Sequence, residues 1–159
     1  MAAMFCPGIP LKDSMKLKGK LEIFDRKKNG EWYKVLEHHN LVVTAGRNLT
    51  RDRLFTNETD YVQYGAVGTG TTAPTLSDTA LETPLDSRQA FDTVRTTTDA
   101  QAQVDWTYTF DEANGDHSEA GLFCESTGGT MLCRAAFTPS TKDSTVERLY
   151  RWTIDISGA

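Results

Sequence analysis

The residues best suited to chemistry are the histidines, and none of them stands in a pattern typical of a catalytic or metal site. His38 and His39 are adjacent, and because neighbouring residues of a strand point to opposite faces, they cannot share one metal ion without a bulge. We interpret them as surface or half-buried residues before a core strand. His117 has Asp116 and Glu119 nearby, but no serine or cysteine nucleophile can be tied to it by spacing. The sequence therefore predicts no catalytic residue and no metal.

Two further stretches share only part of a ligand-binding pattern. The segment Gly68-Thr-Gly-Thr-Thr-Ala-Pro74 has the glycines of a phosphate-binding loop, but it lacks the terminal Gly-Lys-Ser/Thr and a parallel βαβ context. Its glycines more simply let the chain turn sharply at a sheet edge. The acidic residues between 111 and 119 miss the spacing of a calcium loop, so we interpret them as a solvated hairpin tip. These acidic residues are Asp111, Glu112, Asp116 and Glu119. No cofactor is expected.

The three cysteines are an odd number, which suits a reducing compartment better than a secreted disulfide framework. Cys124 and Cys133 flank Gly128-Gly129, which is a strong signal for a two-residue hairpin turn. A turn centred on the two glycines places Cys124 opposite Cys133. The pair is then either two small apolar side chains on one face or a cross-strand disulfide. No other histidine or cysteine lies at zinc-ligand spacing around them.

Length and composition predict one domain with a packed core. The chain has 159 residues, and its 7 Phe, 5 Tyr and 3 Trp are enough aromatic residues for a packed interior. No apolar run approaches the roughly 20 residues of a membrane span, and the opening residues lack the pattern of a signal peptide. A formal charge of −5 argues against wholesale nucleic-acid binding. We expect neither membrane nor specific nucleic-acid partners.

Apolar residues alternate with polar ones along most of the chain, which predicts strands. One helix is expected over about 45–55, capped by Thr44, with Leu49 and Leu54 on its inner side. The predicted fold is a mainly β, jelly-roll-like antiparallel sandwich over residues 16–159. The predicted strands cover 16–25, 32–37, 40–43, 61–67, 87–97, 101–110, 118–125, 131–137 and 146–156, with a polar loop at 138–145.

The first 15 residues are predicted to form an extended arm. Two prolines and a glycine exclude a helix there, and the apolar side chains between them need a surface to cover. Such an arm is either disordered or laid against a neighbour. The residues expected to dock it on a partner are Met4, Phe5, Pro7, Ile9 and Pro10.

Charge is distributed unevenly along the chain. Residues 12–34 hold eight basic groups against four acids, a local charge of +4, so the remainder carries −9. This stretch is either a solvated strand and turn or a docking stripe for an acidic partner surface, such as another copy of the chain. The lysines that would make the docking stripe are Lys16, Lys18, Lys20, Lys27 and Lys28.

Three stretches in a fixed order resemble small virion proteins of tailed bacteriophages. They are residues 38–54 (HHNLVVTAGRNLTRDRL), 66–81 (AVGTGTTAPTLSDTAL) and 118–123 (SEAGLF), the last followed by a Gly-Gly turn and Leu-Cys-Arg-Ala. The same order of motifs occurs in the collar-type attachment domains of phage tail fibres. The resemblance covers roughly residues 38–137. It implies fold-keeping roles for Gly68, Gly70, Pro74, Asp78, Leu81, Glu119, Gly121 and Phe123.

The resemblance implies a non-enzymatic virion structural protein. Fibre proteins continue into a trimeric shaft, whereas this chain stops at Ala159 and carries an arm and a basic strand pair before the shared region. We therefore expect a tail, neck, baseplate or fibre-attachment component rather than a receptor-reading tip. Its expected partners are other virion proteins and copies of itself, in a trimer or ring assembled in the host cytoplasm.

Two other functions remain open from the sequence. A capsid decoration protein would use the arm and the basic strands to clamp neighbouring capsid subunits. A carbohydrate-binding β-sandwich would stack sugars on Trp32, Trp106 or Trp152. Trp106 and Trp152, however, lie in the apolar registers of their strands, so we predict that both belong to the core.

Overall fold

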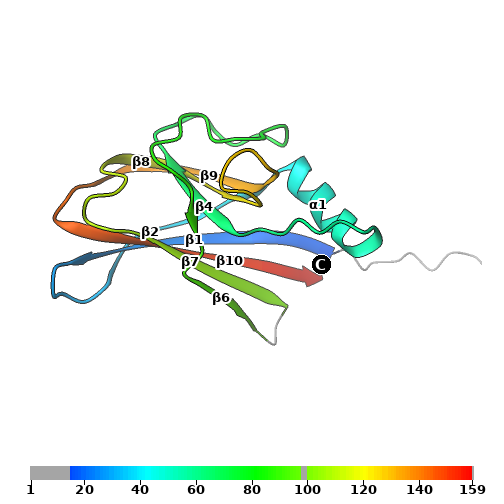
Figure 1. Ribbon diagram of the computed structural model, residues 1–159, viewed down its shortest axis with the longest axis horizontal. Helices are drawn as coiled ribbons and strands as arrows, with labels where there is room; N and C mark the ends of the chain where they lie inside the picture. Colours follow the sequence, from blue (N-terminus) through cyan, green and yellow to red (C-terminus); the bar gives the residue numbers. More distant parts are fainter. Residues whose placement is uncertain (1–14, 98–99, 159) are drawn as a thin grey trace, which may run out of the picture.

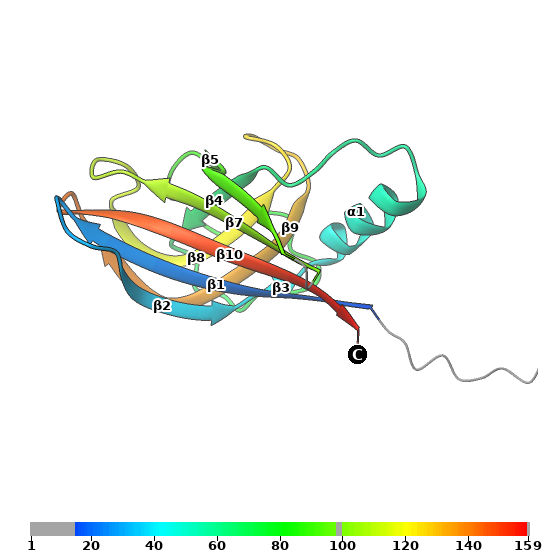
Figure 2. The ribbon, with the colours of Figure 1, turned by 90° about the horizontal axis from the view of Figure 1, so that it is seen from below.

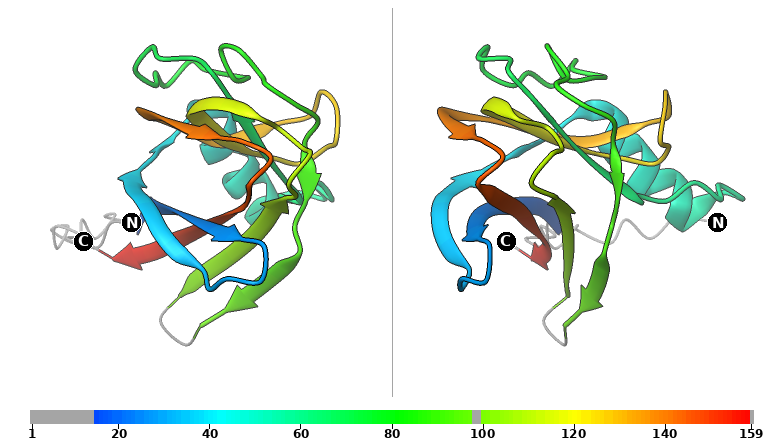
Figure 3. Two further views of the ribbon diagram at one scale, coloured as in Figure 1. Left: turned by 90° about the vertical axis from the view of Figure 1, so that its left-hand side faces the viewer. Right: turned by 60° about the vertical axis from the view of Figure 1, so that its left-hand side comes forward.

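The computed structural model describes residues 15–97 and 100–158, which form two packed antiparallel sheets and one helix (Figures 1 and 3). The prediction of a mainly β antiparallel sandwich with one short helix is confirmed. Sheet A has the order β2 (Tyr33–His39), β1 (Met15–Lys27), β10 (Val146–Gly158), β7 (Gln101–Tyr108) and β6 (Thr93–Thr96). Sheet B has the order β3 (Leu41–Val42), β9 (Met131–Lys142), β8 (Gly115–Phe123), β4 (Tyr64–Gly68) and β5 (Gln89–Ala90).

The core lies between the sheets and is built by alternate residues of each strand. On β7 and β10 the inward positions hold Trp106, Tyr150 and Trp152, none of which is exposed. The Trp106 ring stacks on Tyr150 with 5.0 Å between ring centroids, and on Trp152 at 6.2 Å. Because the period of two puts every second side chain into the core, the predicted inward faces of β7 and β10 are correct for these residues.

Strands β1 and β10 run side by side over their whole length, from Met15 opposite Gly158 to Lys27 opposite Val146. The described chain thus enters and leaves the sandwich at the same end (Figure 2). Met15, which the sequence assigned to the arm, belongs to β1. The rest of the predicted arm lies outside the described residues.

Helix α1 (Thr44–Phe55) confirms the predicted helix, but two of its details differ. Thr44 is the first helical residue, and the cap position belongs to Val43, which makes no side-chain cap bond. Leu49 is buried as expected, whereas Leu54 is 60% exposed. Five residues of helix rotate the side-chain direction by about 500°, so Leu54 lies roughly 140° around the axis from Leu49. Within the described ranges, no helix has the length and apolar character to cross a membrane.

Three boundaries differ from prediction because tertiary contacts decide them. The segment 87–97 forms two strands in different sheets, since Phe91 N–H donates to the carbonyl of Gln63, just before β4 of sheet B, and Asp92 N–H to that of Asp105 in sheet A. Residues 138–142 are not a loop but continue β9 and pair with the start of β8. The expected pairing of Cys124 with Cys133 is wrong: Cys133 lies opposite Leu122, and both cysteines are free.

Candidate functional site

An apolar groove is lined by residues of helix α1, the start of β1 and the end of β10. Figure 2 shows that this helix and these two strand ends lie at the same end of the molecule. Its volume is about 340 Å³, and its lining is almost entirely apolar. Large apolar side chains are exposed around it: Met15 by 62%, Leu54 by 60%, Tyr61 by 57% and, on the adjoining turn of the helix, Phe55 by 81%. Such a cluster makes the groove a candidate docking surface. The remaining apolar lining comes from Leu17, Val42, Leu49, Val62, Leu132, Ile154 and Ile156.

Close docking of the first turn of α1 explains why the groove exists. A Cβ at Gly46 would overlap the backbone carbonyl of Leu132 on β9, so only glycine lets the helix lie this close to sheet B. The residue before the helix is tied to the same strand, because Val43 N–H donates to Leu132 O at 3.2 Å. The helix is thus fixed at its first turn, and its last turn, with Leu54 and Phe55, borders the groove without being buried.

A basic rim borders the groove on the outer side of β1. A second hollow of about 480 Å³ is lined by Lys16, Lys18, Arg47 and Arg51 together with Leu54 and Phe55 of the helix. Arg51 is paired with Asp52 at 2.7 Å, whereas Lys16 and Lys18 are exposed and have no carboxylate partner among the described residues. The rim therefore keeps uncompensated positive charge next to an apolar surface.

The lysines predicted as one docking stripe are separated by the structure. Lys16 and Lys18 lie at the rim, but Lys27 and Lys28 lie at the β1–β2 turn, at the other end of β1 (Figure 1). The eleven steps from Lys16 to Lys27 span roughly 36 Å of strand. Lys20 is compensated by Glu22 at 3.3 Å. The predicted docking residues of the arm, Met4, Phe5, Pro7, Ile9 and Pro10, lie outside the described residues.

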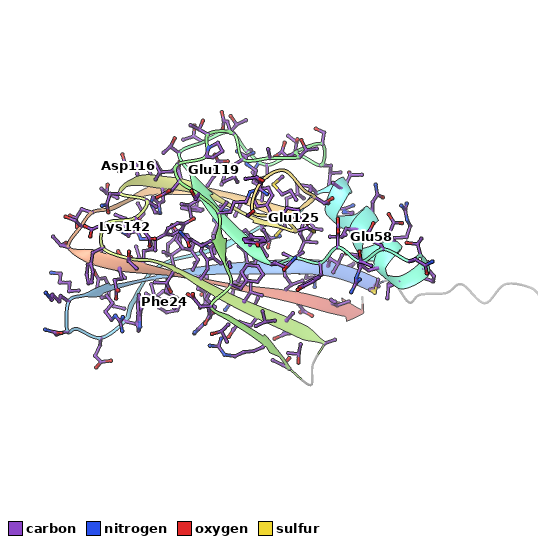
Figure 4. All side chains as sticks on the ribbon, in the orientation of Figure 1. Phe24, Glu58, Asp116, Glu119, Glu125 and Lys142 are labelled. Carbon is purple, nitrogen blue, oxygen red and sulfur yellow. The ribbon has the colours of Figure 1, made fainter. Side chains whose placement is uncertain are left out.

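Glu119 is the centre of a buried polar cluster that holds the loop 68–83 on sheet B (Figure 4). Its carboxylate accepts hydrogen bonds from the backbone N–H groups of Gly70, Glu82 and Thr83 at 2.7–3.1 Å. It also accepts one from Arg134 Nε at 2.8 Å. The prediction that Glu119 belongs to a solvated hairpin tip is wrong, because the residue is 0% exposed.

Most residues that the resemblance singled out gather around this cluster. Gly68 and Gly70 pack so closely on the Glu119 carboxylate that a Cβ at either would collide with it. Asp78 accepts a hydrogen bond from Arg134 Nη1 at 2.9 Å. Leu81 and Phe123 share a small apolar core with Gly121 beneath them, and Pro74 is half-buried in the same loop. The arrangement anchors the loop and leaves no free polar group for chemistry on the Glu119 carboxylate.

Sequence reasoning missed a second buried polar cluster, which lies at the β1–β2 hairpin end of the sandwich. Arg148 donates to both carboxylate oxygens of Asp25, at 2.7 and 2.8 Å, and to the carbonyls of Ser140 and Thr141. The guanidinium thus fixes the last part of β9 against β1 and β10. A signal for the cluster is present in the sequence, since Asp25 and Arg148 occupy inward registers beside Ile23 and Tyr150.

His117 adjoins this cluster and has no exposed surface. Its Nε2–H donates to the Ala113 carbonyl at 2.5 Å, so Nδ1 accepts the hydrogen bond from the Tyr150 hydroxyl. Burial, assisted by the nearby cations Arg148 and Lys142, lowers the pKa of His117 to about 4. Lys142 is labelled in Figure 4. The imidazole is therefore neutral at pH 7, with both nitrogens engaged inside the protein.

The lowered pKa of His117 predicts acid destabilisation. Because the unfolded chain binds a proton near pH 6.5 and the folded chain only near pH 4, the contribution is fully present above pH 6.5 and is lost as the pH falls to 4. The free energy of unfolding should decrease by about 3 kcal/mol over this range from this group. Urea titrations at a series of pH values measure this free energy for the wild type and for His117→Gln. Between pH 6.5 and 4 the stability of the variant should fall less steeply than that of the wild type. An equally steep fall in both proteins would contradict the lowered pKa of His117 as the cause.

The remaining candidate groups do not form a reactive or metal site. Burial raises the pKa of the Cys124 thiol to about 11 and that of the Cys133 thiol well above its usual value. Trp106 and Trp152 are fully buried and unable to stack on a sugar, and Trp32 is half-buried beneath the Arg26 guanidinium. Over residues 15–97 and 100–158, no three His, Cys, Asp or Glu side chains are placed to hold a metal ion.

Comparison of the chain with protein-family models, with curated proteins and with solved structures found no match. The function is therefore inferred from the groove, its rim, the two buried clusters and the motifs of the sequence.

Proposed function

We propose that this chain is a non-enzymatic structural protein of a tailed-bacteriophage particle, which docks through protein–protein contacts as a tail, neck, baseplate or fibre-attachment component. The observation that carries the docking role is the exposed apolar groove with its basic rim. A monomeric soluble protein rarely leaves such a contiguous apolar patch in water, because covering the patch with a partner is favourable. The assignment to a phage particle comes from the motifs of residues 38–137.

The polar groups of the protein support docking rather than catalysis. Glu119 and Arg148 are both fully buried. Glu119 accepts hydrogen bonds from backbone N–H groups and from Arg134. Arg148 donates to a backbone carbonyl and to Asp25. His117 has both ring nitrogens occupied. The groove offers apolar side chains and a cationic edge, which suit a partner with an apolar segment and few positive charges.

A capsid decoration protein is a second candidate, and the separation of the basic residues favours it. Lys16 and Lys18 lie at one end of β1 and Lys27 and Lys28 at the other, so the two ends could contact two neighbouring acidic subunits. The number of copies in purified particles separates the candidates. Hundreds of copies support decoration, whereas tens or fewer support the tail apparatus.

Incorporation into particles tests the docking role. Leu54→Asp puts a charge into the wall of the groove and should reduce the amount of the chain in purified particles at least about tenfold. The side chain is already exposed, so circular dichroism and thermal stability should stay close to those of the wild type.

Leu76→Asp is the matched control, because Leu76 is also exposed, by 46%, but lies outside the groove. This variant should be incorporated normally. Equal incorporation of both variants, measured by quantitative mass spectrometry of the particles, would contradict the groove as the docking site. Absence of the wild-type chain from particles would contradict the virion assignment itself.

A further inference from the structure

We propose that the groove receives residues 1–11 of a second copy of this chain, so that each copy donates one N-terminal segment and accepts another. The inference rests on the proposed docking function and specifies the partner of the same groove. It follows from four features of the protein: the composition of residues 1–11, the charge of the rim, the unpaired edge of β1 and the length of the segment.

The composition of residues 1–11 matches the lining of the groove. The segment, MAAMFCPGIPL, has no charged side chain, and it carries Met4, Phe5 and Ile9. The groove is likewise lined mostly by apolar residues, and its polar lining residues are Thr50, Arg53 and Asp60. Inserting an uncharged segment removes apolar surface from water on both partners without burying an unpaired charged side chain.

The basic rim disfavours the simplest alternative, in which two grooves pack face to face. Such a dimer would bring Lys16 and Lys18 of one copy towards the same lysines of the other, and like charges repel. A segment without charged side chains avoids this repulsion, because it fills the groove while the two rims stay apart.

The edge of β1 beside the groove is open to an extended segment. Strand β2 pairs with β1 only from Lys20 onwards, so residues 15–18 have a strand partner on the β10 side alone within the described part of the chain. Met15 and Leu17 of this stretch also line the groove. Pro7 and Pro10 keep residues 1–11 from forming a helix and favour an extended conformation, which can lie along such an edge.

The length of the segment suits a contact between copies. Fourteen extended residues reach up to about 46 Å, whereas the twelve residues of α1, which form the groove wall, measure about 18 Å. At Met15 the chain is still paired with Gly158 and runs along the axis of β1. Each copy then has one donated segment and one groove, an arrangement that is satisfied by two copies that exchange segments or by a closed ring of more copies.

The test mixes two full-length variants that are defective in opposite ways. Phe5→Asp disables the segment but leaves the groove intact, and Leu54→Asp disables the groove but leaves the segment intact. Light scattering coupled to gel filtration, under reducing conditions so that Cys6 forms no disulfide, gives the mass of each protein. The wild type should form an oligomer, each variant alone should be a monomer, and the equimolar mixture should form a one-to-one dimer.

Each other outcome overturns the inference. A mixture that stays monomeric shows that the segment does not enter the groove of another copy, including the case in which it covers its own groove. A Phe5→Asp protein with the oligomeric state of the wild type shows that another surface holds the copies together. Leu76→Asp, the control outside the groove, should oligomerise as the wild type does. The two tests can also disagree. If Leu54→Asp reduces incorporation into particles but the mixture stays monomeric, the proposed docking function is retained and a second copy of the chain is rejected as the occupant of the groove.

Discussion

Replacing Glu119 by alanine is expected to lower the free energy of unfolding by about 3–5 kcal/mol, which is a large part of the stability of a single domain. The substitution removes the fully buried carboxylate partner of the Arg134 guanidinium and leaves it the less buried carboxylates of Asp78 and Glu82. It also removes the acceptor of three backbone N–H groups, at Gly70, Glu82 and Thr83. Each unsatisfied buried donor adds to the cost.

Chemical denaturation measures this loss, and hydrogen exchange locates it. The amides of Gly70, Glu82 and Thr83 should exchange much faster in the variant than the amides of β10, because the loop 68–83 loses its anchor. Glu82→Ala is the matched control. The Glu82 carboxylate is 41% exposed and lies 3.4 Å from Arg134, so its loss should cost less than about 1 kcal/mol. Similar losses for the two variants would show that Glu119 is not the anchor.

If Glu119→Ala does not fold, the conservative variant Glu119→Gln keeps the test informative. The glutamine oxygen can still accept some of the backbone hydrogen bonds, but the charge opposite Arg134 is lost. We expect an intermediate stability, with fast exchange confined to the loop 68–83. A uniform loss of protection over both sheets would contradict a local anchoring role.

Asp25→Ala is expected to cost a similar amount, about 3–5 kcal/mol, at the opposite end of the sandwich. The Arg148 guanidinium has no exposed surface, and its two hydrogen bonds to Asp25 compensate its charge. Without the carboxylate a buried cation remains, with hydrogen bonds to the neutral carbonyls of Ser140 and Thr141. The side-chain contact between β1 and β10 at this end of the sandwich is then lost.

A second ion pair between the same two strands is the control for Asp25→Ala. Arg26 and Glu147 are also paired across β1 and β10, at 2.6 Å, but Arg26 is 40% exposed. Glu147→Ala should therefore cost less than about 1 kcal/mol in the same denaturation experiment. The double variant Asp25→Leu/Arg148→Met removes both buried charges and should recover part of the loss. Equal costs for the two single variants would contradict the role of burial.

The two buried clusters hold the elements around the proposed docking surface in place. The Glu119–Arg134 cluster ties the loop 68–83 to sheet B, and Thr44 at the start of α1 donates its N–H to Leu76 in that loop at 2.9 Å. The Asp25–Arg148 pair joins β1 and β10, whose opposite ends border the groove. Loss of either cluster should thus weaken docking indirectly, through the folded state.

Local patterns were enough to predict the fold class. The alternation around Trp106 and Tyr150 depends only on the period of the strand, and the buried faces follow from it. The turn at Gly128 and Gly129 was also recognised, and both glycines have φ of 64°. The strand pairing next to this turn was predicted incorrectly. Cys124 N–H donates to Thr130 O, and the register between β8 and β9 shifts at Leu122/Phe123.

The motifs pointed to the surroundings of Glu119 but not to its chemistry. Gly68, Gly70 and Glu119 were selected by resemblance, and only the structure shows that the carboxylate accepts the bonds of a loop 36–49 residues away in sequence. Burial of a charge depends on a partner from another strand. For Asp25 that partner is Arg148, which is 123 residues away, so no local pattern could assign the pair.

By itself, the sequence determined a mainly β antiparallel sandwich, one helix near residue 50 and a core containing Trp106 and Trp152, because periodicity and turn residues act over a few positions. Only the tertiary structure decided where the apolar groove lies. The groove exists because Gly46 lets α1 approach β9 and because Leu17 and Ile156, which lie opposite each other on β1 and β10, line it. Contacts between distant residues depend on packing, and packing is not encoded in any local pattern.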